Sequence, residues 1–237
     1  MKILLIDTCG ATGSVALADT DSESVVVASA TLPGRTASER LVPAIKDLAA
    51  RGGIGLPSLD AVAVVHGPGS FTGVRVGLSA AKGLCEALGL SLVAISRLAV
   101  LAHLAQAAAG TRIYTLLDAG RGEFYVGVYV DGNRLREALL TRDELLAVVD
   151  SNAAQAHIVV GCEPVVVQAL VALHPRLVAE SAAEDALPLA LGRIRQHDFD
   201  DAATLDANYL RRTDAEIFAK PRSGNDSALQ RAGTSLR

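Results

Sequence analysis

The sequence predicts an α/β protein built from two related halves. Apolar stretches rich in branched residues alternate with stretches of helical periodicity along most of the 237 residues. The order of the opening segment Ile3–Asp19, an apolar run ending in Asp, a glycine-containing loop and a second apolar run, recurs at Tyr114–Gly132. Because an internal repeat of this kind is typical of a duplicated unit, we predict one half at residues 1–110 and a second at 111–212.

The first half predicts a three-stranded meander followed by alternating helices and strands. Its opening strands are rich in branched apolar residues and are separated by turn residues. The first helix is expected to end at Gly52-Gly53 and to tolerate Pro43 in its first turn. The expected strands are Lys2–Asp7, Gly13–Asp19, Ser24–Ala30, Ala61–His66 and Ser91–Ile95, and the expected helices are Ser38–Arg51, Thr72–Leu88 and Arg97–Ala109.

The second half opens with the repeated strand, loop and strand, in which Asp118 corresponds to Asp7. Further helices are expected at Arg142–Asp150, Glu163–Leu173 and Glu184–Gln196, with strands at His157–Gly161 and Arg176–Ala179. Residues 213–237 have few large apolar side chains and no periodicity. We therefore predict a disordered tail there.

Composition narrows the function. The net charge of −4 and pI near 5.7 argue against a free-standing nucleic-acid binder, which usually carries a basic surface. Three cysteines, Cys9, Cys85 and Cys162, lie far apart without a C-x-x-C pair, as expected for reduced thiols. The opening apolar run is too short for a signal sequence, and no run reaches membrane-spanning length. These features predict a cytoplasmic protein.

A glycine-rich stretch, His66–Gly83, joins a predicted strand to a predicted helix. It is not a Walker loop, because no lysine follows Gly73. Gly67, Gly69 and Gly73 nearly match the dinucleotide fingerprint G-x-G-x-x-G, but the gap between Gly69 and Gly73 is one residue too long. The stretch resembles an oxyanion-hole loop, yet the chain has no G-x-S-x-G elbow to supply a nucleophile. Two interpretations stay open: backbone amides that face an anion, or glycines that let strand and helix pack closely.

Four segments resemble the TsaB (YeaZ) family. They are "LLIDT" (Leu4–Thr8), "GPGSFTGVRVGLSAAKGL" (Gly67–Leu84), "LDAGRGEFYVGVY" (Leu117–Tyr129) and "YLR" (Tyr209–Arg211), and the resemblance spans about residues 1–212. It implies a duplicated actin-like, Hsp70-like fold of the ribonuclease H-like (ASKHA) class. Two departures are "ASERLVP" (Ala37–Pro43), which lacks a histidine that many relatives carry, and Ala207-Asn208 in place of a proline.

The resemblance also implies a role. Family members work with the catalytic, metal-bearing TsaD and the ATPase TsaE to place threonylcarbamoyl on the adenosine beside the tRNA anticodon. This chain would be the required, non-catalytic partner of a TsaD-like subunit, a homodimer when alone, and in contact with tRNA only through the complex. An independent actin-fold ATPase or phosphotransferase and a glycoprotease remain alternatives. Arg211-Arg212 could touch RNA phosphate or simply be solvated.

A nucleotide-type cleft is the candidate site. In actin-like folds phosphates lie between the two halves, which here points to Asp7, Thr8, Gly69, Ser70 and Asp118. The loops "DTCGATG" and "DAGRGE" carry fewer hydroxyls and glycines than a working phosphate grip. We therefore expect no tightly bound cofactor, with ATP or ADP held at most weakly or shared at the partner interface. The five histidines are too far apart for an H-x-x-x-H pair, so no metal site is expected.

The helix of the glycine-rich stretch has an apolar arc wider than one sheet requires. The Ser38–Arg51 helix could cover the remainder, whereas the resemblance implies that both helices form a bundle with a partner. The interface residues expected on that basis are Leu41, Ile45, Val76, Gly77, Ala80, Leu84 and Ala87.

Overall fold

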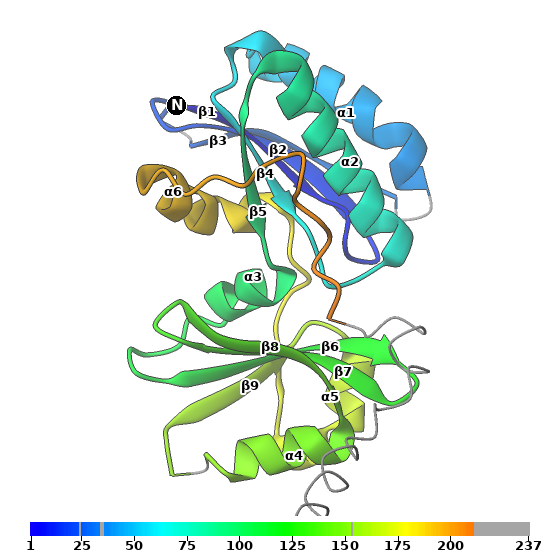
Figure 1. Cartoon of the computed structure of the whole chain (residues 1–237), viewed down its shortest axis with the longest axis vertical. Helices are drawn as coiled ribbons and strands as arrows, with labels where there is room; N and C mark the ends of the chain where they lie inside the picture. The colour runs from blue at the N-terminus through cyan, green and yellow to red at the C-terminus, as the bar shows by residue number, and fades with distance from the viewer. Residues whose placement is uncertain (24, 34–35, 153, 211–237) are drawn as a thin grey trace, which may run out of the picture.

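The computed structural model describes residues 1–23, 25–33, 36–152 and 154–210. Two five-stranded sheets lie one above the other along the long axis of the molecule (Figure 1). The predicted tail at 213–237 and Arg211-Arg212 lie outside the described residues.

The first sheet has the order β3-β2-β1-β4-β5. Its strands are β1 (Lys2–Asp7), β2 (Gly13–Asp19), β3 (Val26–Leu32), β4 (Ala61–Val65) and β5 (Ser91–Ile95). Strands β1 to β3 pair antiparallel, whereas β4 and β5 run parallel to β1. The central strands β1 and β4 are nearly continuous apolar runs because both of their faces are buried. Helices α1 (Ala37–Gly52) and α2 (Phe71–Leu88) cover one face (Figure 1).

The second sheet has the order β10-β9-β6-β7-β8. Its strands are β6 (Arg112–Gly120), β7 (Glu123–Val130), β8 (Asn133–Thr141), β9 (His157–Gly161) and β10 (Arg176–Leu177). An antiparallel meander followed by parallel strands on its other side matches the first sheet strand for strand. Helices α4 (Arg142–Asp150) and α5 (Pro164–Ala169) accompany it, with the 3-10 turn η3 (Val171–Leu173) after α5. The predicted duplication is therefore confirmed by topology.

Helix α3 (Arg97–Leu104) lies between the two sheets (Figure 1). It follows directly on β5 of the first sheet and packs its apolar side chains on Ile113, Leu117 and Tyr129 of the second. The helix is shorter than the predicted Arg97–Ala109, because Gln106 adopts a left-handed conformation, with φ 47°. Helix α3 thus connects the two halves both covalently and by packing.

The chain returns to the first sheet after β10. The 3-10 turn η4 (Ala183–Ala186) and helix α6 (Leu187–Arg195) pack against the first sheet, so the prediction that Glu184–Gln196 completes the second half was wrong. The small side chains Ala183, Ala186 and Ala190 are buried in the first core and allow this close approach. Beyond α6, Asp200 forms a β-bridge with Leu92.

Several boundaries differ from the prediction. Strand β8 was missed because it is a polar edge strand, mostly exposed over its first half. Strand β3 is shifted by two residues from the expected Ser24–Ala30. Helix α1 begins at Ala37, which places Pro43 in its second turn, on the exposed side, rather than in its first. Within the described part of the chain, no helix combines the length and apolar character needed to cross a membrane.

Candidate functional site

The glycines after β4 allow helix α2 to pack directly on the end of β1. A Cβ atom at Gly69 would collide with the Cys9 carbonyl oxygen. At Gly73 and Gly77 a Cβ atom would collide with the carbonyl oxygen and the hydroxyl of Thr8, respectively. The Thr8 hydroxyl in turn donates a hydrogen bond of 2.6 Å to the Gly73 carbonyl. The structure therefore shows the close packing that was one of the two interpretations of this stretch.

The backbone of the same stretch binds three other parts of the chain. Ser70 N donates to the Cys9 carbonyl at 2.9 Å, and Arg97 N, at the start of α3, donates to the Gly67 carbonyl at 2.8 Å. Asn208 N donates to the His66 carbonyl at 2.8 Å. The Ser70 hydroxyl caps α2 by accepting a hydrogen bond from its backbone. The glycine-rich stretch is thus a crossing point for β1, α3 and the end of the described chain.

The predicted cleft residue Asp7 lies buried between the halves. Its carboxylate accepts hydrogen bonds from Cys9 N at 2.8 Å and from the Ser181 hydroxyl at 3.3 Å. Burial raises the pKa of Asp7, because removal from water disfavours the charged carboxylate. Thr8 is likewise buried, whereas Ser70 is exposed at the start of α2.

A buried arginine links the carboxylates of the two halves. We call Asp7, Arg97, Glu163 and Glu180 the Arg97 cluster. The Arg97 side chain is 3% exposed, and its guanidinium lies 3.3 Å from Glu180 and 3.9 Å from Glu163. Burial raises the pKa of Glu163, which accepts a 2.7 Å hydrogen bond from Asp118 N. The structure therefore brings Asp7 and the Asp118 backbone to one junction, where the nearby cation is the chain's own guanidinium. The Asp118 side chain is exposed, and its carboxylate accepts a hydrogen bond from Gly120 N at 2.8 Å.

The same junction has limited nucleophilic chemistry. Cys162 lies 3.9 Å from Arg97, yet burial raises its pKa to about 11. Burial also raises the pKa of Cys9. Both side chains are therefore thiols rather than reactive thiolates near neutral pH. Over the described ranges, no group of three or more His, Cys, Asp or Glu side chains is placed to hold a metal ion.

A second buried carboxylate, Glu137 on β8, was missed by the sequence analysis. Its side chain is 4% exposed. One of its oxygens accepts hydrogen bonds from Ser96, at 2.5 Å, and from the Tyr129 hydroxyl, and the other accepts from Asn208 at 2.7 Å. The sequence gives no indication that this glutamate is buried, because it lies in a charged edge strand and its hydrogen-bond donors come from distant segments of the chain. Ser96 and Arg97, adjacent at the start of α3, thus contact two separate carboxylate clusters.

The predicted partner interface is divided between core and surface. Leu41, Ile45 and Gly77 are buried in the first core, beneath the contact between α1 and α2. Val76, Ala80 and Leu84 are half-buried, and Ala87 is exposed. Helix α1 therefore covers part of the apolar arc, which was the alternative left open by the sequence. The rest of α2 faces outward.

An aromatic stack lies at the N-terminal end of this outward face. It consists of Phe71, Arg75 and Tyr209. Residue Phe71 is 59% exposed and Tyr209 46% exposed. The Arg75 guanidinium lies 3.5 Å above the Phe71 ring centroid, and its Nε donates a 2.8 Å hydrogen bond to the Tyr209 hydroxyl. Phe71 and Arg75, with Thr72, Val76 and Ser79, line a shallow open groove.

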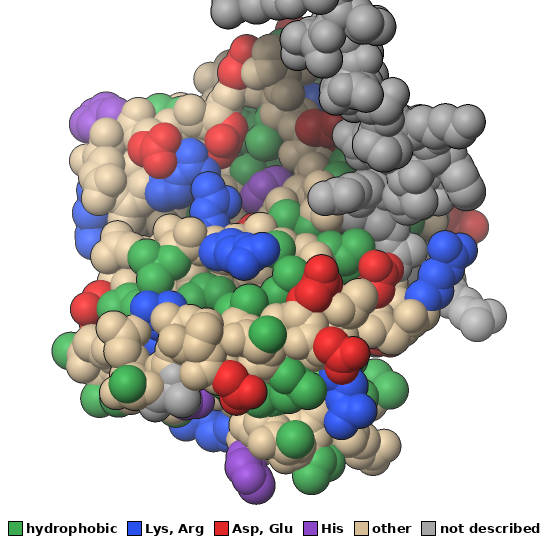
Figure 2. Space-filling view, turned by 60° about the horizontal axis from the view of Figure 1, so that its bottom comes forward, with side chains coloured by type: hydrophobic (Ala, Val, Ile, Leu, Met, Phe, Trp, Pro, Cys, Tyr) green, Lys and Arg blue, Asp and Glu red, His purple; other side chains and the backbone are tan. Residues whose placement is uncertain are grey.

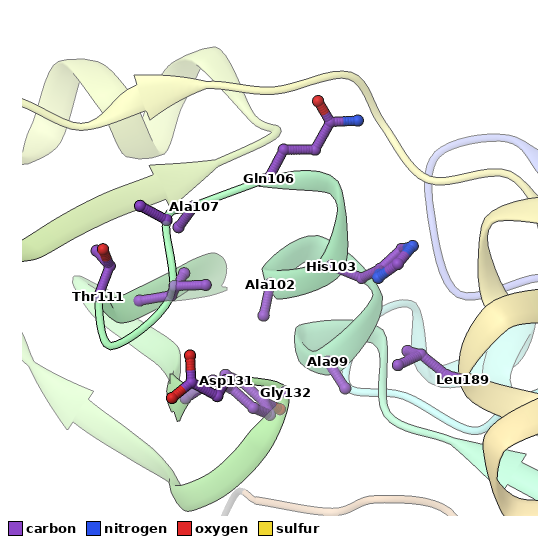
Figure 3. Close-up of a pocket in the computed structure, with 12 residues that line it drawn as sticks. Ala99, Ala102, His103, Gln106, Ala107, Thr111, Asp131, Gly132 and Leu189 are labelled. Atoms are coloured by element: carbon purple, nitrogen blue, oxygen red, sulfur yellow. The ribbon is translucent and has the colours of Figure 1, made fainter.

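A separate cavity of about 330 Å³ lies beside the end of α3 (Figure 3). Alanines of α3 and the loop after it form much of its wall. His103 lies on the Leu189 side, whereas Thr111 and Asp131 lie on the opposite side, and Gln106 points away from them (Figure 3). The Asp131 carboxylate accepts a 2.7 Å hydrogen bond from Gly110 N. The polar groups do not converge on one point, so the cavity has no evident binding chemistry.

Comparison with known proteins identifies relatives of the chain. The family described as "TsaD: tRNA N6-adenosine threonylcarbamoyltransferase" matches residues 31–155. The "tRNA threonylcarbamoyladenosine biosynthesis protein TsaB" of Escherichia coli (strain K12) is 37% identical over 54% of this chain and 55% of its own length. The Bacillus subtilis (strain 168) protein of that name is 35% identical over 59% and 60%. The chain thus spans little more than half the length of these curated relatives.

Solved structures extend the likeness to nearly the whole chain. One is a Pseudomonas aeruginosa protein described as having similarity to peptidase YEAZ, with a TM-score of 0.73 and 30% identity over 89% of this chain and 99% of that one. YeaZ from Pseudomonas aeruginosa has a TM-score of 0.72 and 28% identity over 88% and 99%. The two matching sheets and this likeness define a duplicated actin-like fold, as predicted. The chain belongs to the TsaB (YeaZ) family, which confirms the resemblance seen in its motifs.

Proposed function

We propose that this chain is the non-catalytic partner subunit of a tRNA N6-threonylcarbamoyladenosine transferase complex, and that it binds and activates a TsaD-like catalytic subunit. Family membership supports this role. The TsaD-family match over residues 31–155 also supports it, because it covers α1 and α2. A partner built on the same framework has matching helices to pack against these two.

The observation that carries the non-catalytic role is the filled junction between the halves. The Arg97 cluster sets three carboxylates against one buried guanidinium. A phosphate group entering there would meet excess negative charge and would compete with Arg97 for space. The glycines of α2 are in contact with β1 rather than open to a ligand. We therefore expect nucleotide to be bound at most weakly, or shared at the interface with the partner.

The outward face of α2 is the proposed docking surface. Val76, Ala80 and Leu84 present half-buried apolar surface there, and Ala87 extends it. In the absence of the partner, the same face would support a homodimer. A TsaE-like ATPase and tRNA complete the proposed assembly, with tRNA contacted only through the complex, as expected in a bacterial cytoplasm. Figure 2 shows acidic and basic side chains interspersed on the face that it presents, rather than one continuous basic surface.

Pairing with a TsaD-like chain tests the proposal. We expect the two purified chains to elute together in gel filtration. Ala80→Arg should abolish pairing while circular dichroism shows a folded protein, because a charge buried in an interface without a partner costs several kcal/mol. The matched control is Ala147→Arg, on the exposed side of α4 in the other half, which should pair normally.

The tRNA product provides the second measurement. The chain alone, with tRNA and threonylcarbamoyl-adenylate, should form no modified adenosine, whereas addition of the TsaD-like and TsaE-like proteins should restore it. Modification by the chain alone, or steady-state ATP hydrolysis by it, would contradict the non-catalytic role. Unimpaired pairing of the Ala80→Arg variant would contradict the assignment of the docking face.

A further inference from the structure

The last described residues, Leu205–Leu210, form a C-terminal segment that runs from the first sheet toward the second (Figure 1). Its start is held by α2, where Lys82 Nζ donates a 2.9 Å hydrogen bond to the Leu205 carbonyl. Its middle is anchored by the buried Ala207 and by the hydrogen bond from Asn208 N to the His66 carbonyl. The segment therefore has a defined path although it belongs to neither sheet.

Asn208 connects this segment to the buried Glu137 of the second sheet. The Asn208 amide donates to one Glu137 oxygen at 2.7 Å. Ser96 and Tyr129 donate to the other oxygen, so donors from three separate segments fix the carboxylate. Because a buried carboxylate with several donors has little freedom to rotate, it orients the Asn208 side chain from beneath.

The next residue, Tyr209, lies at the surface, and its position follows from that of Asn208. Its hydroxyl accepts the hydrogen bond from Arg75, whose guanidinium covers Phe71. Exposed aromatic rings around an arginine have the composition of binding hot spots. Because the rings and guanidinium already hold one another, a partner that binds them loses less side-chain entropy than it would on mobile residues. The guanidinium keeps further N–H groups that can donate to a carboxylate or carbonyl.

We propose that Glu137 and Asn208 are positioning residues, which hold Tyr209 against Arg75 and Phe71 so that the aromatic stack anchors the partner on α2. This inference rests on the proposed function, and the occupant is the TsaD-like chain. The stack is continuous with the outward face through Val76, which lines the same groove. A protein partner is favoured over RNA because the chain is acidic overall, with net charge −4, and because Arg75 is the one cation among the five residues that line the groove.

The test measures the dissociation constant for the purified TsaD-like chain by isothermal titration calorimetry. Phe71→Ala and Tyr209→Ala should each weaken binding about tenfold or more, the loss typical of hot-spot residues. Asn208→Ala should weaken it by a smaller factor, because it loosens Tyr209 without removing the ring. The Asn208→Ala/Tyr209→Ala double variant should bind like Tyr209→Ala alone, since the first residue acts through the second. Tyr209→Phe, which removes only the hydroxyl, should give an intermediate loss.

Controls separate this claim from the proposed function and from misfolding. Phe199→Ala removes another exposed aromatic ring, 40% exposed, and should bind like the wild type. Melting temperatures identify any variant that fails to fold. If Asn208→Ala fails to fold, Tyr209→Phe still tests the contact between Tyr209 and Arg75. Absence of wild-type binding would overturn the proposed function and this inference together. Wild-type binding that Phe71→Ala and Tyr209→Ala leave unchanged would overturn this inference alone.

Two further outcomes would also overturn it. Additive losses in the double variant would show that Asn208 does not act through Tyr209. Normal binding of the TsaD-like chain combined with weaker tRNA binding by the assembled complex would assign the aromatic stack to RNA instead.

Discussion

Replacement of Gly73 by alanine measures how closely α2 packs on β1. In an open helix this change stabilises by about 1 kcal/mol, because alanine loses less conformational entropy than glycine. Here the new Cβ atom would collide with the Thr8 carbonyl oxygen and lie 3.1 Å from its carbon. Thr8 is 3% exposed at the end of a central strand, so the backbone has little room to move. Overpacking of this kind costs about 1–3 kcal/mol, occasionally more.

Gly83→Ala is the matched control. Gly83 lies in the same helix, and a Cβ atom there would meet nothing within 4 Å. For a chain of this length about 1 kcal/mol corresponds to a melting-temperature shift of about 2–4 °C. We therefore expect calorimetry to show a decrease of about 2–12 °C for Gly73→Ala and an increase of about 2–4 °C for Gly83→Ala. If both variants are equally stabilised, the close-packing interpretation is refuted, and the stretch is free for another role.

Three further predictions concern the junction between the halves. Arg97→Met should lower the unfolding free energy at pH 7 by about 1–3 kcal/mol, as measured in urea, because it leaves the buried Asp7 and the partly exposed Glu163 and Glu180 without their cation; an unchanged value would contradict the cluster's role. The pKa of Asp7 is raised above its ordinary value of 3.8 in the folded state. The stabilisation that protonated Asp7 gives the folded state is therefore fully present below pH 3.8 and is lost as the pH rises through the folded-state pKa. The Asp7→Asn variant should therefore be at least as stable as wild type at pH 7, and its unfolding free energy should vary less with pH above about pH 4. A steeper dependence of the unfolding free energy on pH would contradict the raised pKa of Asp7. Cys162, with a pKa of about 11, should react with iodoacetamide at pH 7 far more slowly in the native state than in denaturant, and equal rates would show that the thiol is accessible and activated.

Element prediction succeeded where the decisive pattern was local. Strands β1, β2, β5 and β9 and helix α4 have the predicted bounds, because buried strands are short apolar runs between turn residues and α4 has clear helical periodicity. The polar edge strand β8 was missed for the opposite reason. Its first half faces solvent and so carries no apolar alternation. The backbone pairing that makes it a strand is supplied by β7.

The candidate site was only partly predictable. The motifs singled out Asp7, Thr8, Gly69 and Ser70, and the structure brings these together at the end of β1. The Asp118 backbone reaches the same junction from the second sheet through Glu163. Their nucleotide-binding role stays a prediction. Helical periodicity could not decide which part of the apolar arc of α2 faces the core and which part faces outward. Both the sheet and α1 can pack on that arc, and the sequence does not show how much of it each one covers.

The sequence by itself determined the duplicated α/β fold, the family and the sharp turn from strand to helix. These follow from repeats, periodicity and glycine positions, which are properties of neighbouring residues. Only the tertiary structure decided which distant groups meet: Arg97 with Glu163 and Glu180, and Glu137 with Ser96 and Asn208. It also decided that the chain returns to the first sheet after β10. Contacts between distant segments leave no periodic trace, because each depends on how the whole chain closes and on whether a buried charge finds its donors there.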